Sequence, residues 1–226
     1  MFKLLSYFSV LLLVLCVACK KGDDYKKYLE GGEIPYPDKG LSVAANGGNN
    51  RVEVAWVLPK AGPLPVQYKL YWNNRMDSSL GEILKAGSDT VRIWLDNMPE
   101  GTYSFELYGL DNAGHRSVPN YFGGKSYGGD YRQSILNRVV SGTNVTGDTV
   151  ALEWAAKDSG LVFTRLSYRN IHDVVVTADV PADTMQTFLI GYKGGNYVRQ
   201  QSFYRPEQYA IDTFATIADS FRVTNL

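Results

Sequence analysis

The sequence RVEVAW, residues 51–56, decides the fold, because an apolar side chain at every second position leads up to a tryptophan. Successive side chains of a β-strand point to opposite faces, so Val52, Val54 and Trp56 share one face. The chain contains a second copy of this pattern, TVALEW, at residues 149–154. Each segment is therefore predicted to be a strand that places one face in a hydrophobic core.

Further matching segments follow the two tryptophan strands in the same order. Residues 66–74 align with residues 162–170 without a gap, residues 89–95 align with residues 183–189, and residues 101–103 align with residues 195–197. A shared order with loops of changed length is typical of a tandem duplication. Chance similarity is the alternative, because period-two patterns are common in all-β chains. The sequence favours two related domains.

The first copy also carries a recognisable series of motifs. A Y-x-L-x-W strand occupies residues 68–72, a P-x-G-x-Y-x-F-x-L-x-G run occupies residues 99–109, and a D-N-x-G turn follows at residues 111–114. Together with the earlier tryptophan, this series resembles a fibronectin type III domain. The resemblance implies that Tyr103 is placed like the tyrosine corner of that fold.

The second copy departs from this pattern near its end. It keeps Trp154, Leu166, Leu189 and Tyr197 at the matching positions, but Arg199 and Gln201 stand where the first copy has Phe105 and Leu107. A polar pair at core positions indicates a bulge, a shifted register or a degenerate sandwich in the second domain.

We therefore expect an all-β protein with two tandem fibronectin type III or immunoglobulin-like β-sandwiches, preceded by a lipoprotein signal peptide and a tether. The expected segments are a signal peptide at residues 1–18, a tether at residues 19–33, a fibronectin type III-like domain at residues 34–122, a linker at residues 123–135 and a more divergent sandwich at residues 136–226.

The N-terminus has the features of an export signal. Lys3 precedes an apolar segment, residues 4–17, which is too short to span a bilayer. The sequence CVAC at residues 16–19 resembles a bacterial lipobox, which implies cleavage before Cys19 and a lipid on its thiol, although a leucine is usual where this chain has Cys16. Ordinary secretion, with Ala18 before the cut, is the alternative.

Three stretches resemble a family of Bacteroidetes surface lipoproteins of unknown function. They are CKKGDDYKKYLEGGEIPYP at residues 19–37, RSVPNYFGGKSYGGDYRQSILNR at residues 116–138 and SFYRPEQYAIDTF at residues 202–214. The resemblance implies a protein anchored by its N-terminal lipid to the outer membrane and facing the cell exterior. It implies a location and a fold rather than a reaction, and neighbours of such proteins often serve glycan uptake or adhesion.

Composition and motifs narrow the function further. The 23 basic and 23 acidic residues balance, so no nucleic-acid partner is expected. The chain lacks H-E-x-x-H and P-loop motifs, and its two histidines, His115 and His172, stand in predicted loops. We expect no catalytic residue, no metal site and no cofactor. A carboxylate-based glycan hydrolase that uses residues such as Asp212 is the less favoured alternative.

The remaining candidates are aromatic side chains on outward strand faces. Alternation places Trp94, Tyr71 and Tyr108 outward in the first domain and Phe188 outward in the second. Such side chains stack on sugars or pack on proteins, so these four are predicted ligand-binding residues of a non-enzymatic surface binding or adhesion protein, with a glycan or a partner protein as ligand. They could instead cover the sheets or dock the two domains. A structural spacer is the alternative function.

Overall fold

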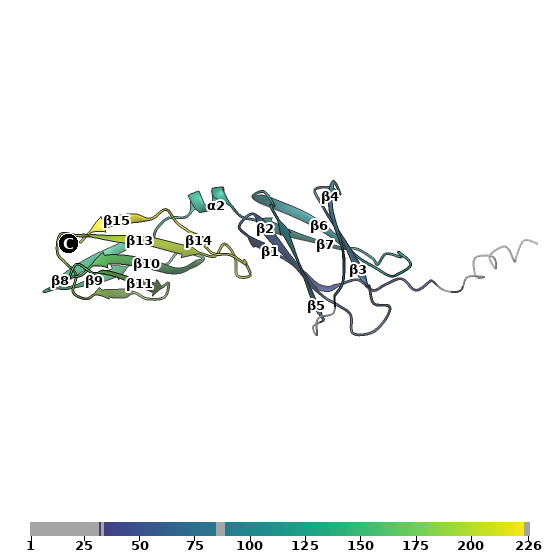
Figure 1. The fold of residues 1–226 in the computed structure, drawn as a ribbon, viewed down its shortest axis with the longest axis horizontal. Coiled ribbons are helices and arrows are strands. Elements are labelled where there is room, and N and C mark those ends of the chain that lie inside the picture. The colour runs from purple at the N-terminus through teal and green to yellow at the C-terminus, as the bar shows by residue number, and fades with distance from the viewer. Residues whose placement is uncertain (1–31, 33, 85–88, 224–226) are drawn as a thin grey trace, which may run out of the picture. The chain divides into compact units, whose positions relative to one another are not determined.

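The structure, a computed structural model, describes residue 32, residues 34–84 and residues 89–223 (Figure 1). The predicted signal peptide, residues 1–18, and the predicted lipidation residue, Cys19, lie outside these residues. Every strand described below belongs to one compact unit, Pro37–Leu226. No helix in the described part of the chain has the length and apolar character that crossing a membrane requires.

The first sandwich consists of seven strands in two antiparallel sheets. One sheet has the order β1 (Leu41–Gly48), β2 (Arg51–Val57) and β5 (Thr90–Asp96); the other has the order β4 (Asp77–Glu82), β3 (Gln67–Trp72), β6 (Gly101–Leu110) and β7 (Asn120–Ser126). A three-stranded sheet facing a four-stranded sheet is the arrangement expected of a fibronectin type III-like domain. β7 continues beyond residue 122 into the segment predicted as a linker, where the short helix α2 (Gly129–Ser134) follows it.

The core of the first sandwich lies between its two sheets. Val52, Val54 and Trp56 on β2 are at most 2% exposed, and Leu70 and Phe105 pack against them from the opposite sheet. Burying each such side chain contributes about 1.5–3 kcal/mol. The predicted core face of β2 is therefore confirmed, although Glu53 and Ala55 on its opposite face are buried as well.

Tyr103 adopts the predicted tyrosine corner. Its ring is buried, and its hydroxyl donates a hydrogen bond of 2.7 Å to the carbonyl of Pro99, four residues upstream. This bond fixes the turn that leads into β6.

The second sandwich repeats this plan. One sheet has the order β12 (Gln186–Leu189), β9 (Thr149–Trp154) and β8 (Val140–Thr146). The other contains β11 (Val175–Pro181), β10 (Leu161–Arg169), β13 (Tyr197–Tyr204) and β14 (Phe214–Ala215), and β15 (Asp219–Arg222) also pairs with β13. Trp154, Leu166 and Leu189 are buried in its core. The all-β class with two tandem sandwiches is confirmed.

The alignment of Tyr197 with Tyr103 is wrong by one residue. β13 buries Val198, Gln200, Ser202 and Tyr204, whereas Tyr197 is 54% exposed and stacks at the surface under the guanidinium of Arg222. The residues that face inward are therefore Gln200 and Ser202, and Arg199 points outward. A shifted register, one of the three outcomes expected, puts uncharged polar groups in the core in place of a charged arginine.

Candidate functional site

The four predicted aromatic residues do not form one site. Trp94 is 49% exposed on β5, and Phe188 is 57% exposed on β12 of the second sandwich. Tyr71 on β3 and Tyr108 on β6 lie together on the other sheet of the first sandwich, with ring centroids 6.3 Å apart in an edge-to-face arrangement. The structure therefore joins Tyr71 and Tyr108 and leaves Trp94 and Phe188 apart from them.

Register explains why further side chains join these two tyrosines. Glu106 on β6 lies directly opposite Tyr71 on β3 and opposite Tyr121 on β7, and Tyr108 lies two residues further along β6. Residues paired across a sheet, and residues two apart on one strand, point to the same face. We call the group formed by Tyr71, Tyr108, Tyr121, Glu106 and Arg75 the tyrosine face.

Arg75 reaches the tyrosine face from the turn between β3 and β4. Asn73, Asn74 and Arg75 all have positive φ angles, of 49°, 53° and 65°, so the chain reverses tightly after β3. Asparagine tolerates this left-handed conformation better than most residues. The turn places the Arg75 guanidinium against the Glu106 carboxylate, with Nε–Oε2 and Nη2–Oε1 distances of 2.6 and 2.5 Å.

The Glu106 carboxylate holds the tyrosine face together. It accepts both Arg75 bonds, a bond from the Tyr108 hydroxyl and a bond of 3.1 Å from the Tyr121 hydroxyl. Arg75 is the main cause that lowers the pKa of Glu106 to about 2, and the bond to Glu106 raises the pKa of the Tyr108 hydroxyl. A carboxylate with a pKa this low is ionised at neutral pH, so it has no proton to donate and is a weak base.

The tyrosine face borders a shallow hollow of about 160 Å³. Its lining includes Tyr71, Asn74, Arg75, Glu106 and Tyr121. Tyr121 is 73% exposed, and its hydroxyl bond fixes the position of an otherwise free ring. The hollow therefore offers fixed aromatic surfaces beside amide and guanidinium donors.

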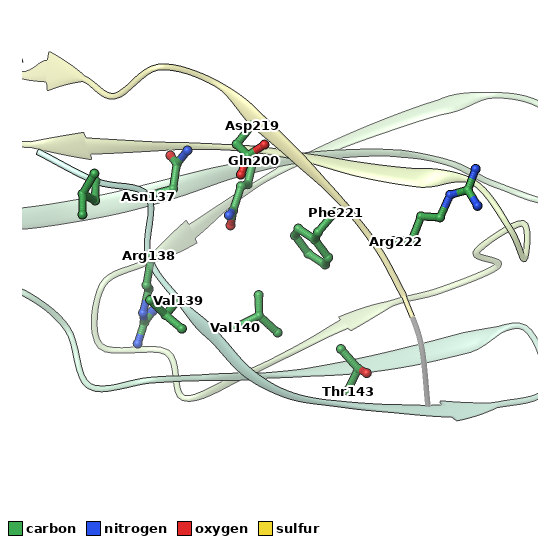
Figure 2. A pocket seen from close by; sticks show the side chains of 10 residues that line it. Asn137, Arg138, Val139, Val140, Thr143, Gln200, Asp219, Phe221 and Arg222 are labelled. Atoms are coloured by element: carbon green, nitrogen blue, oxygen red, sulfur yellow. The ribbon is translucent and has the colours of Figure 1, made fainter. Parts of the chain in front are cut away.

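A second concave feature is a groove of about 510 Å³ in the second sandwich. In Figure 2, Val140 and Thr143 come from one side, Phe221 comes from the other, and Arg138 and Gln200 lie at one end. β8 and β15 belong to different sheets, and no bridge joins them among the described residues. In the first sandwich the corresponding strands meet through a parallel bridge between Asn49 and Tyr127, so the groove is a feature of the second sandwich.

Asp212, the carboxylate considered for hydrolysis, is held in a structural contact between segments of the two sandwiches. It accepts two bonds from Arg51, at 2.9 and 2.6 Å, and one from the backbone N–H of Asn49 at 2.8 Å. Arg51 lowers the pKa of Asp212, and its guanidinium also lies over the Trp94 ring at 5.2 Å. Trp94 therefore lies beside this contact, against an arginine of its own sandwich, and stays 49% exposed.

Sequence reasoning missed Arg75, Glu106 and Tyr121 of the tyrosine face. The alternation that placed Tyr108 outward also places Glu106, two residues earlier, on the outward face. Alternation alone gives no reason to choose a carboxylate as a site residue. Tyr121 can be assigned to the tyrosine face only from the pairing of β6 with β7. Arg75 can be assigned to it only from the geometry of the turn between β3 and β4. In the groove, Gln200 was hidden by the register error in β13.

Two tandem sandwiches with fibronectin type III-like strand order and an outward tyrosine face define a modular all-β protein. The chain belongs to the DUF4998 family, a domain of unknown function, whose family model matches residues 19–214. No curated protein matches it. Among solved structures it is similar to a segment of two fibronectin type III domains of chicken tenascin, at 14% identity over 82% of this chain and 100% of that chain, with a TM-score of 0.35. It is also similar to the FN1–FN3 domains of chicken CNTN1, at 12% identity over 84% of this chain and 66% of that chain, with a TM-score of 0.44.

Proposed function

We propose that this protein is a non-enzymatic binding protein, held at the outer face of the outer membrane by a lipid on Cys19, that binds a glycan through the tyrosine face. The observation that carries the proposal is the Glu106 carboxylate, which fixes Tyr108 and Tyr121 through their hydroxyls and Arg75 through two bonds. Side chains fixed before binding lose little conformational entropy when a ligand arrives.

The chemistry of the tyrosine face favours a sugar over a protein ligand. A sugar ring has apolar C–H faces and a rim of hydroxyl groups, which suit an aromatic ring beside polar side chains. The exposed Tyr121 ring offers the aromatic surface, and Arg75 and Asn74 offer donors beside it. Protein interfaces instead centre on a desolvated apolar core, whereas Asn74, Arg75 and Glu106 stand among the aromatic rings that line this hollow.

The test is a glycan panel probed with the full chain purified in detergent. We expect Tyr71→Ala and Tyr121→Ala to weaken binding of any captured glycan about tenfold, because losing one stacked aromatic ring removes roughly 1–2 kcal/mol. Tyr209→Ala is the matched control, since Tyr209 is also exposed, at 71%, and lies outside the tyrosine face. Absence of glycan binding, or equal binding by all three variants, contradicts the proposal, and binding to a protein panel alone would favour a protein ligand.

A structural spacer is the second candidate function. The contact that Asp212 makes with Arg51 and Asn49 supports it, because a spacer needs its two sandwiches tied together. If the protein is a spacer, the Asp212→Ala variant should lose its biological role. Every ligand test on the tyrosine face should then be negative. The glycan panel therefore separates the two candidates.

A further inference from the structure

Two side chains in the wall of the groove are buried without a full set of partners. Arg138 is 2% exposed and Gln200 is 8% exposed. Arg138 Nη2 donates a bond of 3.2 Å to the carbonyl of Ala155, and the guanidinium lies over the Trp154 ring at 5.1 Å. Nε and Nη1 of Arg138 and Oε1 of Gln200 have no hydrogen-bond partner. Among the described residues, no carboxylate forms an ion pair with Arg138.

These unpaired atoms stand out against the polar groups next to them. Ser202, two residues along β13 from Gln200, bonds through its hydroxyl to Thr164 at 3.0 Å and accepts the backbone N–H of Arg138 at 2.9 Å. The backbone N–H of Ser202 donates to the Thr216 hydroxyl at 2.9 Å. These groups around Ser202 all have hydrogen-bond partners. In this part of the groove, the polar atoms without partners belong to Arg138 and Gln200.

An unpaired buried charge is costly, so a partner for it is expected. Buried polar groups in proteins are almost always hydrogen-bonded, and a buried charge is normally paired. Burial lowers the pKa of the Arg138 guanidinium, but arginine stays protonated in proteins. Asp183 acts on this guanidinium electrostatically, but it is paired with Lys157 and does not bond to Arg138. A bound molecule could supply the directly bonded counter-charge.

We propose that this groove, lined by Arg138, Gln200 and Phe221, is a binding site for a sugar acid, a ligand with one carboxylate and neighbouring hydroxyl groups. The proposal concerns a different surface from the tyrosine face and does not rest on it. It assigns one oxygen of the ligand's carboxylate to Nη1 of Arg138 and a ligand hydroxyl to Oε1 of Gln200, the atoms that lack partners in the protein.

Each part of the ligand follows from one part of the groove. A guanidinium carries a fixed positive charge, and its Nη1 donates a charge-assisted hydrogen bond to a carboxylate oxygen. Oε1 of Gln200 only accepts hydrogen bonds, so the ligand must present a donor there, and a hydroxyl does so. Phe221 and Val140 offer apolar surface for the C–H face of the ring, and the groove volume of about 510 Å³ lies in the range of small-molecule sites.

The test is calorimetric titration of the full chain in detergent with D-galacturonate, with D-galactose and acetate as probes that lack the carboxylate and the hydroxyls respectively. We expect measurable binding of galacturonate, with galactose and acetate at least tenfold weaker. Arg138→Met and Gln200→Met should each weaken galacturonate binding at least tenfold. The matched control is Arg199→Met, which removes a neighbouring arginine that points outward.

A second measurement separates a ligand site from a structural role. Replacing an uncompensated buried charge by an apolar side chain is often stabilising, so Arg138→Met should raise the melting temperature while it abolishes binding. Arg138→Lys keeps the charge but lacks the planar guanidinium with its Nη1 donor, and should bind galacturonate more weakly than the natural chain. Absence of galacturonate binding, equal binding of galactose, unchanged binding by Arg138→Met, or a lower melting temperature of that variant would overturn the proposal. Tyr121→Ala leaves galacturonate binding unchanged if the two surfaces are independent.

Discussion

Glu106 is the residue on which the tyrosine face depends. The residue is 7% exposed and its carboxylate is bonded by Arg75, Tyr108 and Tyr121, so one acidic side chain fixes three neighbours. Hydrogen bonds to a charged group are stronger than those between neutral groups. A change at this single position should therefore alter the geometry of the whole face.

The lowered pKa of Glu106 predicts a pH-dependent contribution to stability. Its pKa falls from 4.5 to about 2 on folding, so the stabilisation is fully present above about pH 4.5 and is lost as pH falls through about 2. We expect Glu106→Gln to reduce the free energy of unfolding by roughly 1–3 kcal/mol at pH 7, since it removes the charge that Arg75 pairs with.

Urea unfolding of the natural chain and of Glu106→Gln, measured from pH 7 to pH 2, checks this prediction. The difference between the two chains should shrink as pH falls below about 4.5. Glu82→Gln is the control, because Glu82 is an exposed residue on β4 of the same sheet. A difference for Glu106→Gln that stays constant over the whole pH range contradicts the role given to the carboxylate.

At the scale of strands, the register of β13 decides which side chains form the second core and the groove. Val198 is fully buried, whereas its neighbour Tyr197 is 54% exposed. We expect Val198→Asp to reduce the free energy of unfolding by about 3 kcal/mol or more, because it buries an unpaired charge. Tyr197→Asp should change it by less than about 1 kcal/mol, because surface substitutions have small effects.

Thermal unfolding followed by circular dichroism compares these two variants directly. The pair is well matched, since the same residue is introduced at adjacent positions of one strand. A larger loss of stability in Tyr197→Asp than in Val198→Asp would restore the alignment of Tyr197 with Tyr103 and remove Gln200 from the groove.

The strands show where sequence reasoning succeeded and where it failed. The tryptophan strands β2 and β9 were predictable, because a large apolar residue stands at every second position up to the tryptophan in both. The register of β13 was not predictable, because its inward positions include the polar Gln200 and Ser202. In addition, Tyr197 aligns with Tyr103 when the register is one residue off. The outward direction of Tyr71 and Tyr108 was also predictable from alternation. The side chains beside them come from other strands and from a turn, and their positions depend on how the strands pair.

At the scale of the molecule, we propose a protein with two different binding surfaces behind a predicted lipid anchor. Cys19→Ser should release the protein from the membrane fraction, because a covalent lipid is then missing, whereas Cys16→Ser should leave it bound. Cell fractionation with detection of the chain measures both. Loss of membrane binding in Cys16→Ser, or its retention in Cys19→Ser, contradicts the assignment of the anchor.

Nuclear magnetic resonance of the full chain in detergent micelles, with ring-labelled tyrosine, tests the central claim that the tyrosine face binds a glycan. Titration with a glycan captured on the panel should shift the ring signals of Tyr71, Tyr108 and Tyr121 and leave those of Tyr197 and Tyr209 in place. Shifts confined to tyrosines outside the face, or none at saturating glycan, would contradict it.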